Sequence, residues 1–127
     1  MSSRPLFVYG TLRHGYPNRY ARLLERSARY LGTARVPGRL YRVSWYPGMR
    51  VRRGAGWVTG DLFRLRNPAM LAKFDEYEGD HEYRRVAATA VLPGGERMRC
   101  WVYEFIGGVM EGRRVPSGDW MEEDPRC

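Results

Sequence analysis

The sequence predicts an α+β fold: a small, mixed but mainly antiparallel β-barrel of about six or seven strands with a few flanking helices. Three observations predict it. Short runs of β-branched and aromatic residues follow one another closely, most are separated by glycine or proline, and only two stretches repeat apolar residues at helical spacing. Strands spaced this closely suit antiparallel pairing in a meander or barrel.

The first two elements are a strand and a helix joined by a turn-rich segment. Leu6-Phe7-Val8-Tyr9 is apolar and β-prone, and Gly10 stops it. From Asn18 to about Ala28, apolar residues at positions 20, 23 and 24 follow the i, i+3, i+4 pattern of an amphipathic helix, and Asn18 is suited to cap its start.

The middle of the chain alternates β-prone pieces with glycine and proline. Breaks at residues 37–38, 47–48 and 54–56 predict separate strands, which are Tyr30–Val36, Arg39–Val43, Met49–Arg52 and Trp57–Leu65.

A second helix and a hairpin follow. Asn67-Pro68 is a typical helix start, and the apolar stripe that follows ends near Gly79. Two alternating runs, 83–92 and 97–105, are joined by Pro93-Gly94-Gly95-Glu96, which predicts a hairpin.

Size and composition predict one domain over residues 1–127, with an irregular tail from about residue 107. A chain of 127 residues with 43% hydrophobic residues can bury a core of its own. It contains no run of about 18 apolar residues, and its first residues do not read as a signal peptide. We therefore expect a soluble, cytoplasmic protein without a membrane partner.

The charge of the chain is strongly polarised. The formal net charge is +8, and residues 1–60 hold twelve arginines against the single acid Glu25, whereas five acids crowd into positions 75–82. Such a balance suits the approach of a small anionic substrate. The alternative is a basic nucleic-acid-binding barrel, which would need arginines and aromatic residues on one exposed face.

Two segments could carry chemistry. Consecutive backbone N–H groups in the turn Tyr9-Gly10-Thr11-Leu12 could hold a carboxylate or an oxyanion, although an ordinary strand exit would have the same residues. Glu78 belongs to an acidic segment at a helix C-terminus, where the helix dipole and aromatic neighbours raise a carboxyl pKa toward the range of a general base. The alternative is a solvated turn whose acids pair with Arg84 and Arg85.

The remaining reactive residue types do not form a site. Cys100 and Cys127 read as free thiols, and His14 and His81 have no partner at metal-ligand spacing. The chain has no P-loop and no Gly-x-Ser-x-Gly motif, so a hydrolase with a protein nucleophile is disfavoured. Trp45-Tyr46-Pro47-Gly48 is an aromatic loop that could either form a pocket wall or cap the core.

Several motifs together resemble the gamma-glutamylcyclotransferase-like (AIG2-like) family. They are Phe7-Val8-Tyr9-Gly10-Thr11-Leu12-Arg13-His14-Gly15 with Pro17-Asn18, Phe74-Asp75-Glu76-Tyr77-Glu78-Gly79 followed by Tyr83 and Arg85, Trp101-Val102-Tyr103, and Ser117-Gly118-Asp119-Trp120. The resemblance runs from residue 6 to about residue 120.

This resemblance implies a small barrel that cyclises the γ-glutamyl group of an amine or amino acid to 5-oxoproline and releases the free amine, without a cofactor. By position, Tyr9, Gly10, Thr11 and Leu12 would supply backbone donors, and Glu78 would be the general acid/base. Tyr83 and Tyr103 would be aromatic or hydroxyl contacts in the pocket. The alternative on the same fold is a module that binds a small γ-glutamyl-like metabolite without turning it over.

Overall fold

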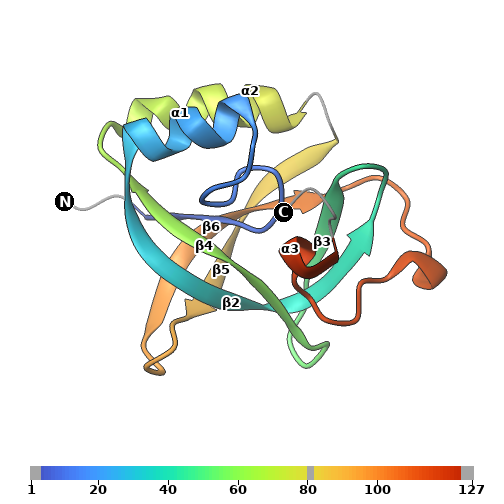
Figure 1. Ribbon diagram of the computed structural model, residues 1–127. Coiled ribbons are helices and arrows are strands. Elements are labelled where there is room, and N and C mark those ends of the chain that lie inside the picture. The colour runs from blue at the N-terminus through green and yellow to red at the C-terminus, as the bar shows by residue number, and fades with distance from the viewer. Residues whose placement is uncertain (1–3, 80–81, 124–127) are drawn as a thin grey trace.

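The computed structural model describes residues 4–79 and 82–123, and it confirms the predicted fold class. The described strands are β1 (Leu6–Val8), β2 (Ala28–Arg42), β3 (Pro47–Val51), β4 (Trp57–Leu65), β5 (Tyr83–Val91) and β6 (Arg97–Phe105). Five of them close into a barrel in the order β1, β4, β2, β5, β6, in which only the β6–β1 contact is parallel. Strand β3 lies outside the barrel and joins β2 to the end of β6 (Figure 1).

The prediction of a strand break at Pro37 and Gly38 is wrong. Strand β2 continues through both residues and changes its pairing partner there. Residues 28–37 pair with β4, and residues 38–42 pair with β3. A Cβ atom on Gly38 would lie 2.3 Å from the backbone oxygen of Arg50. Glycine is therefore present because the strands approach closely, and it does not end the strand.

Both predicted helices are confirmed. The described helical segments are α1 (Arg19–Ser27), a 3₁₀ turn at Pro68–Met70, α2 (Leu71–Gly79), a 3₁₀ turn at Glu111–Arg113 and α3 (Trp120–Glu123). The Asn18 side chain caps α1 by accepting hydrogen bonds from two backbone N–H groups. Helices α1 and α2 lie side by side on one flank of the barrel (Figure 1), where the rings of Tyr20 and Tyr77 stack 4.0 Å apart.

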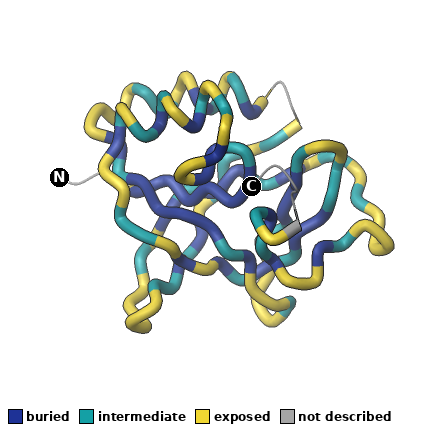
Figure 2. The backbone as a smooth tube through the Cα atoms, viewed as in Figure 1, coloured by how far each residue is buried: buried dark blue, intermediate teal, exposed yellow. Residues whose placement is uncertain are grey.

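The buried side chains form two clusters that meet at β1. One cluster, with Phe7 and Trp120, fills the barrel, and the other, with Leu24 and Phe74, lies beneath the two helices. Neighbouring residues of β1 belong to different clusters, so this strand is covered on both faces (Figure 2). The turn after β1 therefore emerges at the boundary between barrel and helices.

The segment after β6 packs against the barrel. The N–H group of Val115 donates to the backbone oxygen of Leu40 at 2.8 Å, and that of Thr59 donates to the backbone oxygen of Gly118 at 2.8 Å. The Trp120 side chain that follows is fully buried. Within the described residues, no helix is both long enough and apolar enough to cross a membrane.

Candidate active site

One pocket opens where the β1 turn, the end of α2 and the loop before β3 meet. It encloses about 470 Å³ of empty space, open solvent at its mouth included. All seven residues that the sequence nominates line it: Tyr9, Gly10, Thr11, Leu12, Glu78, Tyr83 and Tyr103. Its other lining residues are Phe7, Val8, Trp45, Tyr46, Pro47 and Tyr77.

The turn after β1 presents backbone donors. The N–H group of Arg13 donates to the backbone oxygen of Gly10 at 3.0 Å and closes the turn. Within the described residues, the N–H groups of Thr11 and Leu12, the central residues of the turn, have no hydrogen-bond acceptor. A Cβ atom on Gly10 would lie 2.6 Å from the Pro47 ring, so glycine allows the turn to pack against the start of β3.

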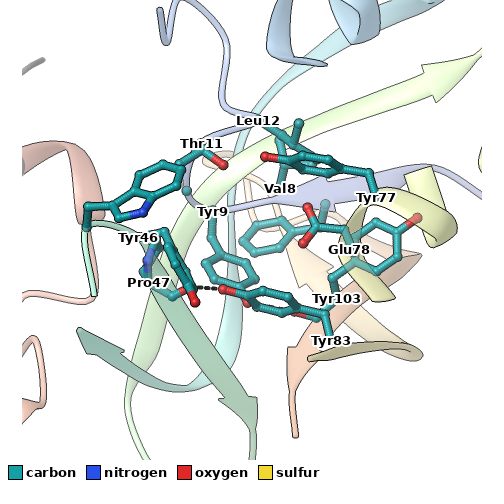
Figure 3. Close-up of a pocket in the computed structure, with 13 residues that line it drawn as sticks. Val8, Tyr9, Thr11, Leu12, Tyr46, Pro47, Tyr77, Glu78, Tyr83 and Tyr103 are labelled. Atoms are coloured by element: carbon teal, nitrogen blue, oxygen red, sulfur yellow. Dashed lines mark hydrogen bonds between the residues drawn. The ribbon is translucent and has the colours of Figure 1, made fainter. Parts of the chain in front are cut away.

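Glu78 supplies a buried carboxyl group from the last turn of α2. Its side chain points into the pocket (Figure 3), and only 8% of the residue is exposed. Among the described residues it forms no ion pair. Loss of solvent raises its pKa from 4.5 to about 8. The group can therefore exchange a proton near neutral pH.

The neighbouring acid Asp75 has a different role from Glu78. Its two carboxylate oxygens accept hydrogen bonds from the Arg85 guanidinium at 2.9 and 3.2 Å. The ion pairing considered for the acidic segment therefore holds for Asp75 and Arg85. Asp80, in the same segment, lies outside the described residues.

Three tyrosine hydroxyl groups in the pocket, those of Tyr9, Tyr83 and Tyr103, donate hydrogen bonds to protein atoms. Tyr9 donates to the backbone oxygen of Tyr103 at 2.6 Å, Tyr83 donates to that of Pro47, and Tyr103 donates to Asp75 at 2.8 Å. Burial raises the pKa values of all three phenols above their usual range, so they stay neutral. Tyr83 and Tyr103 thus offer a ligand mainly their rings, while their hydroxyl groups hold other parts of the site.

The loop before β3 forms an aromatic wall of the pocket, which is one of the two alternatives that the sequence allowed for this loop. Trp45 and Tyr46 meet edge to face with ring centroids 5.1 Å apart, and Tyr46 lies 6.5 Å from the Tyr83 ring. Half of Trp45 is exposed, which places it at the mouth. The sequence analysis did not identify Tyr77, which lines the pocket from α2 and stacks on Tyr20 of α1. Its position directly before Glu78 was the available signal.

Two of the remaining reactive residues, Cys100 and His14, are described by the structure, and neither lines the pocket. Cys100 is fully buried in the barrel, and burial raises its thiol pKa to about 12, so it is a packed residue and a poor nucleophile. His14 is 53% exposed at its side chain and contacts Glu25 at 2.7 Å. His81 and Cys127 lie outside the described residues.

The chain is similar to known proteins over nearly its whole length. The family model described as gamma-glutamyl cyclotransferase, AIG2-like, matches residues 6–122. The gamma-glutamylcyclotransferase family protein YtfP of Escherichia coli K12 is 32% identical over 122 residues, which cover 94% of this chain and 97% of that protein. The solution structure of the E. coli protein matches with a TM-score of 0.66.

More distant solved structures share the fold. An AIG2-like protein from Mus musculus is 25% identical, with a TM-score of 0.72 over 87% of this chain and 82% of its own. An uncharacterized protein from Pyrococcus horikoshii is 24% identical, with a TM-score of 0.72 over 95% of this chain and 92% of its own, and indicates the fold alone. Because the family model spans nearly the whole sequence and the E. coli relative matches end to end, this chain belongs to the gamma-glutamyl cyclotransferase, AIG2-like family.

Proposed function

We propose that this protein cyclises the γ-glutamyl group of a γ-glutamyl amine or amino acid to 5-oxoproline and releases the free amine. The observation that supports the proposal is one pocket that is lined both by a buried carboxyl group with a pKa of about 8 and by a turn whose Thr11 and Leu12 N–H groups have no acceptor among the described residues. Family membership supports this class of chemistry.

The turn is the part of the pocket suited to the anionic end of the substrate. None of the thirteen described residues that line the pocket is lysine or arginine. A substrate carboxylate, or an oxygen that gains charge during the reaction, would therefore rely on the N–H groups of Thr11 and Leu12. The aromatic rings around them exclude water and strengthen these hydrogen bonds.

The reaction needs one group that moves a proton. The substrate's own α-amine attacks its γ-carbonyl carbon, a new C–N bond closes the five-membered ring, and the bond to the leaving amine breaks. Glu78 takes the proton that the attacking amine loses and returns it to the leaving nitrogen. No protein nucleophile and no co-reactant are needed, and the pocket contributes by holding the chain in its ring-closing conformation.

The raised pKa of Glu78 suits this exchange. In the empty pocket at pH 7 the carboxyl group is mostly protonated, because its pKa is about 8. A bound α-ammonium group places a positive charge beside it and lowers its pKa. Glu78 and the amine then share one proton, so the neutral, nucleophilic amine becomes accessible without a large energy cost.

The test is release of 5-oxoproline by the purified protein from a panel of γ-glutamyl amino acids, γ-glutamyl-ε-lysine, glutathione and simple γ-glutamyl amines. Glu78→Gln should abolish release, whereas Glu76→Gln, which changes an exposed acid of the same helix, should not. Binding of a γ-glutamyl compound without release would contradict the enzyme and favour a binding module. No binding and no release would reject both.

A further inference from the structure

Arg13, the last residue of the Gly10–Arg13 turn, is buried between two carboxylates. Its Nε donates to Asp61 at 3.0 Å, and its Nη1 donates to Asp119 at 2.7 Å. Only 7% of its side chain is exposed. Arg13 does not line the pocket, so this buried contact calls for an explanation other than direct contact with substrate.

The Asp61 contact attaches the end of the turn to the barrel. Asp61 lies on β4 directly opposite Val8 of β1. Besides Arg13, it accepts hydrogen bonds from the N–H group of His14 at 3.0 Å and from the hydroxyl of Tyr30 at 3.1 Å. One carboxylate therefore holds both the side chain of Arg13 and the next backbone N–H group.

The Asp119 contact joins parts of the chain that are 106 residues apart. Asp119 is itself well fixed, because its carboxylate also accepts the N–H group of Met121 at 3.0 Å and Trp120 is fully buried. The preceding Gly118 has φ +69° and lies so close to β4 that a Cβ atom would be 2.0 Å from the Trp57 backbone oxygen. The C-terminal segment thus presents Asp119 from a rigid position.

We propose that the Arg13–Asp119 contact positions the Gly10–Arg13 turn for substrate binding, which makes the C-terminal segment a functional support of the site. This inference rests on the proposed function. The turn itself is closed by one backbone hydrogen bond, from Arg13 to Gly10. The contacts of the Arg13 guanidinium with Asp61 and Asp119 restrict how far the turn can move. They therefore also fix the direction of the Thr11 and Leu12 N–H groups.

This role predicts a specific kinetic change. The inference takes the turn to bind the substrate carboxylate, whose charge stays the same during the reaction, so loosening the turn removes binding that both states share and raises KM. Glu78 lies on α2 and keeps its environment. Asp119→Asn should therefore raise KM about tenfold, leave kcat within about threefold and leave the pH dependence unchanged. A merely structural role would lower the melting temperature and leave KM unchanged.

Two variants and one control test the contact. Asn at position 119 keeps an oxygen for the Met121 N–H group but removes the charge. Arg13→Lys keeps the charge, but a single ammonium group does not reproduce the fork that spans two carboxylates. Because Arg13→Lys already disrupts the contact that Asp119→Asn weakens, the double variant should raise KM no more than the larger single effect. Arg114→Gln, in the same C-terminal segment but bonded to the backbone oxygen of Ala55, should leave KM unchanged.

The outcomes separate this inference from the proposed function. If the wild-type protein releases 5-oxoproline and Asp119→Asn keeps its KM within twofold, the positioning role is wrong and the function stands. Binding of γ-glutamyl-ε-lysine to the Glu78→Gln protein, followed by tryptophan fluorescence, gives a second readout that needs no turnover. A Kd weakened about tenfold by Asp119→Asn supports the inference even if wild-type release is absent. An unchanged Kd, or no binding, overturns it.

Discussion

Replacing Glu78 with glutamine should stabilise the protein, and the gain should grow with pH. The folded state raises the Glu78 pKa from 4.5 to about 8, so between these values the folded chain binds the proton more tightly than the unfolded chain. Stability contributed by the protonated form is therefore lost as pH rises through this range. At about 1.4 kcal/mol per pH unit, the full cost above pH 8 is roughly 5 kcal/mol. Glutamine stays neutral at every pH, so the variant does not have this cost.

Urea unfolding at pH 5 and pH 8.5 measures this effect. We expect Glu78→Gln to raise the free energy of unfolding by about 1 kcal/mol at pH 5 and by roughly 4–5 kcal/mol at pH 8.5, the larger figure being an upper value. Glu76→Gln removes an exposed carboxylate of the same helix and should change the free energy of unfolding by less than about 0.5 kcal/mol at either pH. An equal gain for Glu78→Gln at both pH values would refute the raised pKa.

Three further predictions test other parts of the site and fold. For the wild-type enzyme, kcat/KM should rise with pH up to about 8, where Glu78 loses its proton, and a pH–rate profile that is flat from 6 to 8 would contradict its role as the base. Tyr83→Phe removes the hydrogen bond to the Pro47 backbone oxygen and should cost about 1 kcal/mol of stability in urea unfolding, with kcat within about threefold because the ring remains. Gly38→Ala should cost roughly 2–3 kcal/mol in the same assay because its Cβ would meet the neighbouring strand, whereas Gly108→Ala has open space and is the control.

The parts of the fold that the sequence predicts well are those that local rules decide. Strands β4 and β6 begin and end at the predicted residues, because the alternation of side chains and the flanking glycines are local signals. The Asn18 cap marks α1 in the same way. The continuation of β2 through Pro37 and Gly38 was not predictable, because it depends on which strands pair on either side, and pairing is a tertiary property.

The site was predictable only in part. The turn after β1 and Glu78 are visible because short motifs carry them, and both line the pocket. Tyr77 and the Trp45 loop enter the pocket through the packing of separate elements, which spacing along the chain does not encode. The sequence also suggested hydroxyl contacts from Tyr83 and Tyr103, but both hydroxyl groups are bonded to protein atoms, whose positions only the fold defines.

The position of Glu78 in its helix was the strongest signal in the sequence that this residue is functional. An acid at a helix C-terminus and among aromatic residues is disfavoured by the helix dipole and by desolvation, and within the described residues no ion pair compensates it. Nearby Asp75 is compensated by Arg85 and remains a structural acid. Two carboxyl groups three residues apart on one helix therefore differ in what surrounds them, and the uncompensated one is the candidate for proton transfer. A departure from the folding rules with no local compensation is the feature expected where function, and not stability, selects the residue.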